Sequence, residues 1–326
     1  MKRLVFTGPR EYKFEDIDAP EIQHSEDVLI EVKGIGICGT DMHIFSGNRK
    51  VSYPHVAGHE CVGIVKKVGS NVKNIKIGDY VTVEPNFSCR KCDYCLGGMG
   101  NLCLEKKCIG LDLPGCFSEM IIAPEDYVWK LPESISIEEG VVIETATVAL
   151  HAINKANIKL EDKILIVGAG SVGLLALQFA KLSGAAVHIS DVNKKRLQIA
   201  RELGADYTYN VNEQTLPSDF DIVIDAAGAP GSIKQTVHLV KNGGRVVFVG
   251  IPGKPIELDL MTIIRHEIEI LGSVACTNEF SDVISLIDKG KLDAKKIATH
   301  KLAFKDLVKG IELMEKQEAL KPVVIL

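Results

Sequence analysis

Four of the nine cysteines lie close together in the chain, at Cys89, Cys92, Cys95 and Cys103. Thiolates with this spacing can surround a zinc ion as a tetrahedron with no open position, which is typical of a structural zinc site. An iron–sulfur cluster uses the same ligands, and a zinc ribbon that contacts nucleic acid is a second alternative. Because the cysteine count is odd and the chain has 326 residues, metal binding is favoured over a disulfide framework.

A second group of potential metal ligands lies in glycine-rich turns. Cys38 belongs to the sequence GICGTDMH, and His59 and Glu60 belong to GHE. Glu144 is a lone charge in an apolar run, and a buried carboxylate needs a partner. Three protein ligands and one exchangeable position are typical of a catalytic zinc. Glu60 is equally compatible with direct ligation and with a place beside the metal.

The sequence GAGSVG follows a predicted buried strand over Lys163–Val167 and begins a predicted helix over Ser171–Leu182. Gly168 suits the tight turn, Gly170 lets a pyrophosphate approach the backbone, and Gly173 lets the helix pack closely on the sheet. The helix N-terminus supplies free N–H groups and a partial positive charge for the phosphates. The motif therefore predicts a dinucleotide-binding site.

Asp191 ends the next predicted strand, 18 residues after Gly173. A carboxylate at this place accepts hydrogen bonds from ribose hydroxyls and repels a 2′-phosphate, which favours NAD over NADP. Basic residues follow at Lys194, Lys195 and Arg196, and such side chains can instead bind that phosphate. The residues of this segment expected to bind the cofactor are Gly168, Gly170, Ser171, Val172, Gly173, Asp191 and Arg196.

The first half of the sequence predicts short strands, for example where Val28, Ile30 and Val32 alternate with polar residues. From Lys163 onward strand and helix patterns alternate, which indicates a parallel sheet with helices on both faces. After Gly272 the remaining segment is too small to be a domain, and we expect it to return to the first one. The further predicted elements are strands over 187–190, 221–225, 245–250, 268–271 and 321–326, and helices over 194–203, 280–289 and 304–316.

Composition limits the classes of function. Hydrophobic residues make up 46% and charged residues 25%, as in a soluble globular protein, and the length favours two domains. The formal net charge of −5 argues against a dedicated nucleic-acid binder. We see neither a run of roughly 18 apolar residues that would span a membrane nor a signal peptide. We therefore expect a cytoplasmic protein that binds no nucleic acid and no membrane.

Several further titratable residues are assigned to packing or to local hydrogen bonds rather than to chemistry. The cysteines among them sit between apolar or glycine residues. These residues are Cys61, Cys108, Cys116, Cys276, His55, His151 and Asp225.

Taken together, CGTDMH, GHE, GAGSVG and the four-cysteine group resemble the zinc-dependent medium-chain dehydrogenase/reductase family over essentially the whole chain. The sequence VEP at Val83–Pro85, the GNLC ending at Cys103 and Glu144 in place of a cysteine are similar to sorbitol and polyol dehydrogenases. Threonine dehydrogenases, which share CGTD-x-H, are nearly as close. The resemblance implies an α/β protein with a GroES-like β-barrel catalytic domain over 1–145 and 275–326. It also implies a Rossmann domain, a doubly wound parallel sheet, over 146–274.

The same resemblance implies roles for the metal site. Cys38, His59 and Glu60 match the catalytic zinc cluster of the family. Glu144 matches a carboxylate that either binds the zinc or holds its water, and Asp41 matches a group that orients the zinc histidine.

The resemblance also implies a proton path and cofactor contacts. Thr40 matches the hydroxyl that takes the proton of the alcohol, and His43 matches the histidine that passes it to solvent through the nicotinamide ribose. Backbone at Gly250 and Val274 would hold the carboxamide. The family commonly forms homodimers or homotetramers through the cofactor-domain sheet.

We therefore predict a dehydrogenase with two zinc ions per chain that uses NAD on a small-molecule secondary alcohol or its ketone. Sorbitol dehydrogenases place an arginine and a tyrosine where this chain has Ala275 and Cys276, and Phe45 lacks an expected tyrosine hydroxyl. A smaller diol, a cyclic alcohol or an amino alcohol is therefore an alternative to a polyol. An L-threonine-type or sugar-phosphate dehydrogenase and an NADPH-dependent carbonyl reductase are also compatible with these residues. A zinc-bearing NAD sensor that binds nucleic acid is the non-enzymatic alternative.

Overall fold

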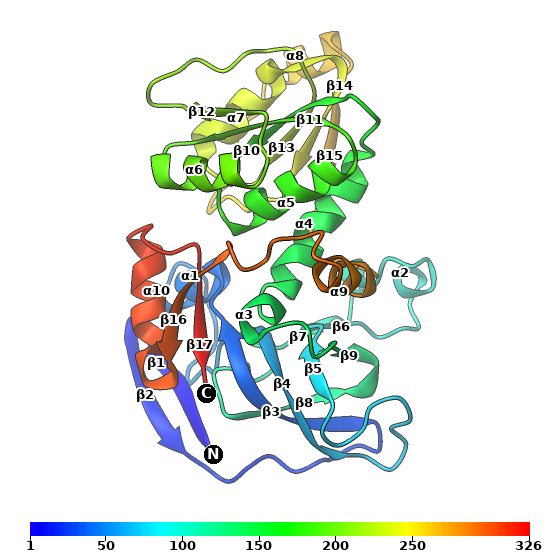
Figure 1. The fold of residues 1–326 in the computed structure, drawn as a ribbon, viewed down its shortest axis with the longest axis vertical. Helices are drawn as coiled ribbons and strands as arrows, with labels where there is room; N and C mark the ends of the chain where they lie inside the picture. Colours follow the sequence, from blue (N-terminus) through cyan, green and yellow to red (C-terminus); the bar gives the residue numbers. More distant parts are fainter. The chain divides into compact units, whose positions relative to one another are not determined.

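The backbone leaves a first structural unit after Glu144 and returns to it at Phe280, so that Thr145–Glu279 form a second unit. This division is present in the computed structural model, which describes residues 1–326 (Figure 1). Unit 1 thus combines Met1–Glu144 with Phe280–Leu326. None of the helices combines the length and hydrophobicity that crossing a lipid bilayer requires.

Unit 1 is rich in short strands, because its sequence alternates apolar and polar residues and is divided by glycine and proline. Its strands are β1 (Lys2–Gly8), β2 (Glu11–Asp16), β3 (Asp27–Gly36), β4 (Glu60–Val68), β5 (Tyr80–Val83), β6 (Asn86–Phe87), β7 (Lys107–Cys108), β8 (Met120–Pro124), β9 (Val128–Lys130), β16 (Ala298–Ala303) and β17 (Lys321–Ile325). Its helices are α1 (Gly39–Phe45), α2 (Asp93–Leu96), α3 (Ile137–Gly140), α9 (Phe280–Asp288), α10 (Leu307–Glu315) and the 3-10 turns η1 (Gly100–Leu102), η2 (Glu125–Tyr127) and η3 (Phe304–Asp306).

The main sheet of unit 1 has seven strands in the order β16-β17-β3-β4-β5-β9, and β8 also pairs with β3. The predicted alternation holds in β3, where Val28, Ile30 and Val32 are buried. β3 pairs antiparallel with β4 and β8, and its last residues pair antiparallel with β17. A strand from the end of the chain therefore lies inside this sheet, directly beside β3.

Unit 2 is the predicted α/β unit. Its strands are β10 (Lys163–Val167), β11 (Ala186–Asp191), β12 (Tyr207–Asn210), β13 (Phe220–Asp225), β14 (Val240–Phe248) and β15 (Glu269–Gly272). Its helices are α5 (Ser171–Leu182), α6 (Lys194–Glu202), α7 (Pro230–Leu239) and α8 (Leu260–Arg265), and α4 (Ile143–Ala156) begins in unit 1 and continues into unit 2.

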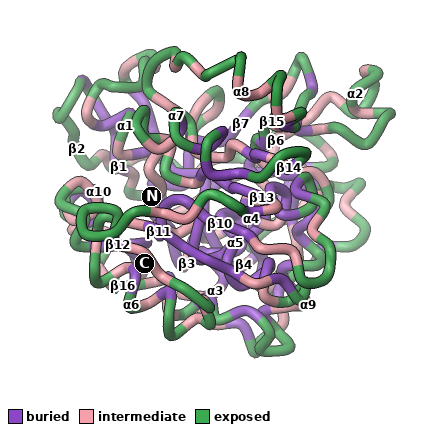
Figure 2. The backbone as a smooth tube through the Cα atoms, turned by 90° about the horizontal axis from the view of Figure 1, so that it is seen from above, coloured by how far each residue is buried: buried purple, intermediate pink, exposed green.

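The six strands of unit 2 are parallel in the order β12-β11-β10-β13-β14-β15. The order reverses at β10, so right-handed crossovers place α5 and α6 on one face and α7 on the other (Figure 1). The predicted strands over 163–167, 187–190, 221–225, 245–250 and 268–271 are confirmed as β10, β11, β13, β14 and β15. In Figure 2 buried backbone follows the inner strands of each sheet, among them β3 and β10, and the connecting loops are mostly exposed.

Candidate active site and metal centres

Three potential metal ligands gather where β3 ends and β4 begins. Cys38 follows the last residue of β3 by two positions and is the N-cap of α1, and Glu60 is the first residue of β4. The antiparallel register pairs Glu60 with Gly36, which brings the two segments together. One ligand atom each of Cys38, His59 and Glu60 lies within 4.8 Å of the others.

This group fits a zinc ion. A thiolate, an imidazole and a carboxylate are all zinc ligands. His59 is 8% exposed, and its Nδ1 is buried without a hydrogen-bond partner. A buried polar atom left without a partner is costly, and coordination of a metal through Nδ1 itself would offset that cost. Burial opposes the charged form of His59, but the neighbouring Cys38 and Asp41 outweigh it and raise its pKa well above the usual value.

Asp41 ties the two ligand segments together. Its Oδ2 accepts a hydrogen bond from the Cys38 N–H (2.9 Å), and its Oδ1 accepts one from the Gly58 N–H (3.0 Å). The same Oδ1 lies 3.8 Å from His59 Nδ1, which is too long for a hydrogen bond. Asp41 therefore fixes the backbone at Gly58, directly before His59. Complete burial raises the pKa of its carboxyl.

Thr40 and His43 lie on α1, three residues apart, so they share one face of the helix. Thr40 is half-buried beside Cys38, and His43 is exposed. Thr40 is therefore the member of the pair nearer to the candidate ligand Cys38 in the chain, and His43 is the member in contact with solvent.

Glu144 lies near the start of α4 and is 8% exposed. It is outside the group within 4.8 Å, and it interacts electrostatically with His59, Glu60 and Lys321. Burial is the main cause that raises the pKa of Glu144 to about 7. The structure thus places Glu144 close to the group formed by Cys38, His59 and Glu60.

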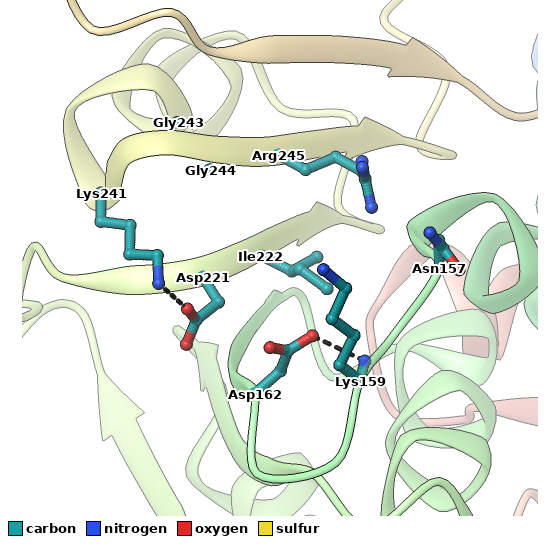
Figure 3. A pocket seen from close by; sticks show the side chains of 9 residues that line it. All are labelled: Asn157, Lys159, Asp162, Asp221, Ile222, Lys241, Gly243, Gly244 and Arg245. Atoms are coloured by element: carbon teal, nitrogen blue, oxygen red, sulfur yellow. Dashed lines mark hydrogen bonds and ion pairs between the residues drawn. The ribbon is translucent and has the colours of Figure 1, made fainter.

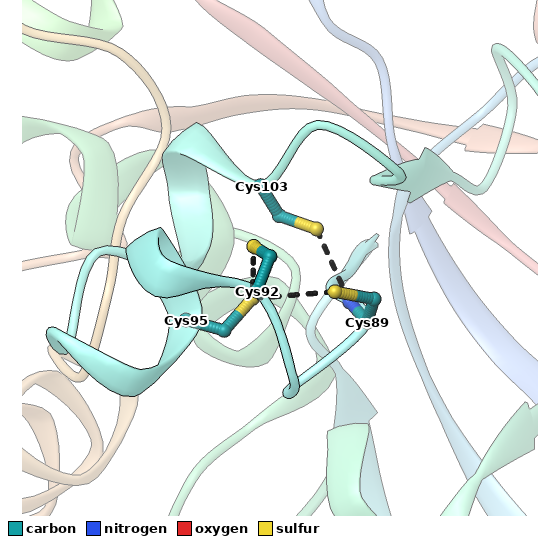
Figure 4. A group of neighbouring side chains, drawn as sticks. All are labelled: Cys89, Cys92, Cys95 and Cys103. Carbon is teal, nitrogen blue, oxygen red and sulfur yellow. Dashed lines mark hydrogen bonds between the residues drawn. The ribbon is translucent and has the colours of Figure 1, made fainter.

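The four-cysteine group forms a separate centre in the lobe of α2 and η1 (Figure 4). The sulfur atoms of Cys89, Cys92, Cys95 and Cys103 all lie within 4.8 Å of one another. Cys95 Sγ lies 3.9 Å from Cys89 Sγ and 3.5 Å from Cys92 Sγ. Four thiolates about 2.3 Å from a zinc ion lie about 3.8 Å apart, so this lobe fits a closed tetrahedral site. Backbone N–H groups, first that of Lys91, lower the pKa of Cys89 to about 6.

The GAGSVG motif joins β10 to α5. Gly168 has φ +101°, and a Cβ on Gly173 would lie 1.8 Å from the Gly168 oxygen, so both positions require glycine. Gly170 is the N-cap of α5, and a Cβ built on it meets nothing within 4 Å. Ser171 and Val172 lie in the first turn of α5, where both are half-buried. The N-terminus of this 12-residue helix carries a partial positive charge next to the open space at Gly170, and this combination suits phosphates.

Asp191 is the last residue of β11, at the same end of the sheet. Its Oδ2 accepts a hydrogen bond from the Ala169 N–H and its Oδ1 one from the Asn193 N–H, each at 2.7 Å. Each carboxylate oxygen keeps a second lone pair for a ribose hydroxyl. Lys194 pairs with Glu213 at 2.5 Å, and Arg196 lies in the first turn of α6 two residues later.

The carboxyl ends of the next strands complete this edge of the sheet. Gly250 follows β14 and donates its N–H to the Asp225 carbonyl (2.9 Å), and Val274 follows β15 and is 43% exposed. Asp225 is fully buried and accepts hydrogen bonds from the Gly228 N–H (2.7 Å) and the Ser232 hydroxyl (2.8 Å). Its predicted role as a local hydrogen-bonding residue is confirmed, and burial raises its pKa.

Comparison with known proteins decides the family. The model of the alcohol dehydrogenase GroES-like domain matches residues 24–133, and that of the zinc-binding dehydrogenases matches residues 171–289. Sorbitol dehydrogenase from Bacillus subtilis (strain 168) is 34% identical over 342 residues, which cover 99% of this chain and 97% of that protein. The chain belongs to the zinc-dependent medium-chain dehydrogenases.

Two further similar proteins support this family assignment. D-xylulose reductase A from Aspergillus niger is 34% identical over 98% of this chain and 95% of its own length. The alcohol dehydrogenase TADH from Thermus sp. ATN1 has a similar structure, with a TM-score of 0.93 and 28% identity over 100% of this chain and 99% of that one. The predicted GroES-like and Rossmann fold is confirmed. The dehydrogenase is a zinc-dependent oxidoreductase that acts on CH–OH groups, so the enzymatic interpretation is confirmed over the sensor.

One residue beside the candidate active site was not predicted from the sequence. Lys321 begins β17, is 2% exposed, and donates through Nζ to both carboxylate oxygens of Glu60, at 2.6 Å to Oε2. Burial opposes its charge, but Glu60 outweighs this and the pKa of Lys321 is raised. In the sequence, the only sign of this role is a lysine at the start of an otherwise apolar strand. The sequence around Lys321 does not show which strand β17 pairs with.

The residues assigned to packing are confirmed as buried, and the two histidines have partners. His55 Nε2 lies 2.9 Å from the Gly110 carbonyl oxygen, and His151 Nδ1 lies 2.7 Å from Glu279 Oε1. The buried cysteines of this set are Cys61, Cys108, Cys116 and Cys276.

A cavity of about 170 Å³ lies at the amino ends of β10, β13 and β14 in the dehydrogenase (Figure 3). This is the opposite end of the sheet from the glycine motif. Lys241 pairs with Asp221, and the Lys159 N–H donates to Asp162 (2.7 Å). Arg245 is bound to a neighbouring carboxylate and a backbone carbonyl. Because its charged groups serve the local structure, we assign this cavity no role in the reaction.

Proposed function

We propose that this dehydrogenase transfers a hydride between a small secondary alcohol and NAD, with a catalytic zinc held by Cys38, His59 and a carboxylate. The observation that carries the proposal is the cluster of Cys38, His59 and Glu60, whose ligand atoms lie within 4.8 Å beside an unpartnered His59 Nδ1. Glu60 and Glu144 are the two candidates for the third ligand. The four cysteines Cys89, Cys92, Cys95 and Cys103 would hold a second, structural zinc.

In this proposal zinc supplies Lewis acidity, which lowers the pKa of an alcohol hydroxyl. Oxidation of the CH–OH carbon then releases one hydride to the nicotinamide and one proton to solvent, and a carbonyl remains. Thr40 accepts the hydroxyl proton, and His43, at the exposed end of the same helix face, passes it outward. Asp41 holds the ligand segments in place through its two backbone hydrogen bonds.

The proposed cofactor is NAD, bound at the carboxyl edge of the unit 2 sheet. Asp191 supports this preference, because its carboxylate would repel a 2′-phosphate. Gly168, Gly170, Ser171, Val172 and Gly173 would hold the pyrophosphate. Arg196, Gly250 and Val274 are the further proposed contacts. The alternative is an NADPH-dependent carbonyl reductase, which the basic start of α6 favours.

The proposed substrate class is a small hydroxylated compound. The relatives named above include a sorbitol dehydrogenase and a D-xylulose reductase, which supports a polyol-like substrate. Ala275 and Cys276 replace the arginine and tyrosine of sorbitol dehydrogenases, which supports a smaller diol, a cyclic alcohol or an amino alcohol. L-threonine and sugar phosphates are further candidate substrates for the same chemistry.

We further infer a homodimer or homotetramer in the cytoplasm, with residues 1–145 and 275–326 as the catalytic domain and 146–274 as the cofactor domain. β15 is an edge strand, and large apolar side chains are exposed on it and on α8, which supports contact with a second copy. They are Leu260, Met261, Ile264 and Ile270. A cytoplasmic location is supported by the nine free cysteines, each of which is either a proposed ligand or a buried packing residue.

The test combines activity with metal analysis. Purified protein is screened for NADH formation at 340 nm across polyols, diols, threonine and sugar phosphates, and its zinc content is measured. We expect two zinc ions per chain and turnover of at least one alcohol class. Cys38→Ala should abolish turnover and remove one zinc while NAD binding persists, whereas Cys108→Ala, a buried cysteine outside both metal groups, should keep both zincs. Full activity of Cys38→Ala would exclude the proposed site.

A further inference from the structure

The first turn of α6 carries three consecutive basic residues close to the proposed adenosine site. They are Lys194, Lys195 and Arg196. Asp191, which ends β11, precedes Lys194 by three positions in the chain. Cationic side chains beside this carboxylate can bind the 2′-phosphate that distinguishes NADP from NAD. The preference of the site therefore depends on which of these cations are available to a phosphate.

Only the first of the three basic residues has an acidic partner. Lys194 pairs with Glu213 at 2.5 Å, whereas Lys195 and Arg196 form no ion pair in the structure. The Lys194 and Glu213 side chains are 71% and 52% exposed. A pair with this exposure contributes little to the stability of a fold. Its main effect is therefore on the charge of this surface.

The turn after β12 brings Glu213 to the edge of the sheet where α6 begins. The parallel register of β11 and β12 places Asn210 beside Asp191. The Val211 N–H then donates to the Asp191 carbonyl (3.3 Å), and the Glu213 N–H donates to the Asn210 carbonyl (2.9 Å). The backbone of this turn is thus tied to the residue that is proposed to bind the ribose.

Glu213 changes the electrostatics for one of the two cofactors. A 2′-phosphate carries a charge of about −1.5 to −2 near neutral pH, whereas a ribose hydroxyl is uncharged. A phosphate beside Asp191 would have to compete with the Glu213 carboxylate for Lys194. It would also experience the negative charge of Glu213 itself, which a hydroxyl does not. The pair therefore disfavours the phosphorylated cofactor and leaves the other one unaffected.

We propose that Glu213 is a specificity-determining residue for NAD: by pairing with Lys194 it withholds this cation from the 2′-phosphate of NADP. This inference rests on the proposed function, because it requires the adenosine ribose at Asp191. It makes the basic start of α6 compatible with a preference for NAD. It also assigns the turn after β12 a part in cofactor choice.

The test measures the binding of NADH and NADPH, which differ only in the 2′-phosphate, by fluorescence titration at low ionic strength. In Glu213→Gln we expect the affinity for NADPH to rise about three- to fivefold and that for NADH to change by less than about twofold, because one exposed pair is lost. The gain should shrink at high salt, where exposed charges are screened. Glu202→Gln is the matched control, since it removes the same charge at the other end of α6.

The substitution is then made in two backgrounds that each lack one lysine. If Glu213 acts by pairing with Lys194, the gain in NADPH affinity should disappear in Lys194→Met and persist in Lys195→Met. An unchanged NADPH affinity in Glu213→Gln, or an equal gain in the Lys194→Met background, overturns the proposal. Because all of these side chains are exposed, the variants should fold like wild type. Failure of the proposed function is distinguishable, since wild-type protein would then bind neither NADH nor NADPH.

Discussion

Single residues of the Cys38 site concentrate acidic groups in a buried part of unit 1. Asp41, Glu60 and Glu144 are 0%, 1% and 8% exposed, and a cysteine ligand binds metal as a thiolate. Buried charges are costly unless they are paired. Lys321 and His59 supply part of the compensation, and a divalent cation at Cys38 and His59 would supply more. The zinc assignment thus accounts for the charges of the site as well as for its donor atoms.

The exposed end of the proposed proton path gives a prediction for His43. His43→Asn should lower kcat by about 10²-fold at neutral pH, because the path loses its proton acceptor. Added imidazole buffer should restore part of the rate, and the KM for NAD should not change. The exposed His24→Asn is the control. A kcat for His43→Asn equal to that of wild type would remove His43 from the path.

Asp191 gives a prediction for cofactor choice. Asp191→Asn should raise the ratio of kcat/KM for NADP to that for NAD by about tenfold or more, because two unit charges about 4 Å apart repel by roughly 1–4 kcal/mol at the surface of a protein. The measurement is initial rates with each cofactor. Asp206→Asn, which removes an ion-paired carboxylate from the same unit, should leave the ratio unchanged. An unchanged ratio in Asp191→Asn would exclude a charge-based preference.

At the scale of elements, we predict that the four-cysteine lobe depends on its proposed zinc for its folded structure. Its helices α2 and η1 have four and three residues, and such short helices are not stable alone. Cys95→Ser should reduce the zinc content from two ions to one per chain and increase proteolysis within residues 89–103, because metal binding supplies folding free energy to such sites. Mass spectrometry of the fragments checks this. Cys108→Ser should keep both zincs, and an intact lobe in Cys95→Ser would contradict a metal-held structure.

Elements with a local pattern were predictable from the sequence, and those fixed by distant contacts were not. β10 and α5 followed from an apolar run and a glycine motif. β12 was missed because Tyr207–Asn210 is a short edge strand with few buried side chains, and α8 was missed because its apolar residues are exposed. At the site, Cys38 and His59 lie in recognisable motifs. The Lys321–Glu60 pair depends on the order of strands, which no local pattern encodes.

For the whole molecule, the second crossing between the units is anchored at two consecutive residues. Glu279, the last residue of unit 2, accepts hydrogen bonds from His151 and from the Thr277 N–H (2.6 Å). Phe280, the first residue after the crossing, stacks on Trp129 of unit 1 with ring centroids 5.7 Å apart. Glu279 is therefore held by residues of unit 2, and Phe280 by a residue of unit 1.

Glu279 gives the prediction at this scale. Burial opposes its charge, but the hydrogen bond with His151 and the Thr277 N–H outweigh it and lower the pKa of Glu279 from 4.5 to about 2. Its contribution to the free energy of unfolding is therefore present above about pH 4.5 and is lost as the pH falls toward 2. Glu279→Gln should be less stable by about 1–3 kcal/mol at pH 7, and the difference from wild type should shrink below pH 4.5. Denaturant unfolding measures this, with Glu318→Gln as an exposed control, and a pH-independent difference would contradict the assignment.

The insertion of unit 2 between the two segments of unit 1 also determines the order in which the parts can mature during translation. The parallel sheet of unit 2 is contiguous in the chain and can close as soon as it leaves the ribosome. β3 must wait for β17 to be synthesised, and until then one side of its carboxyl end is an unpaired edge open to wrong partners. Cys38 and Glu60, the proposed metal ligands, are therefore synthesised early, but Lys321, the partner of Glu60, is synthesised last. A chaperone or a delay in zinc delivery would act on this site after unit 2 has already folded.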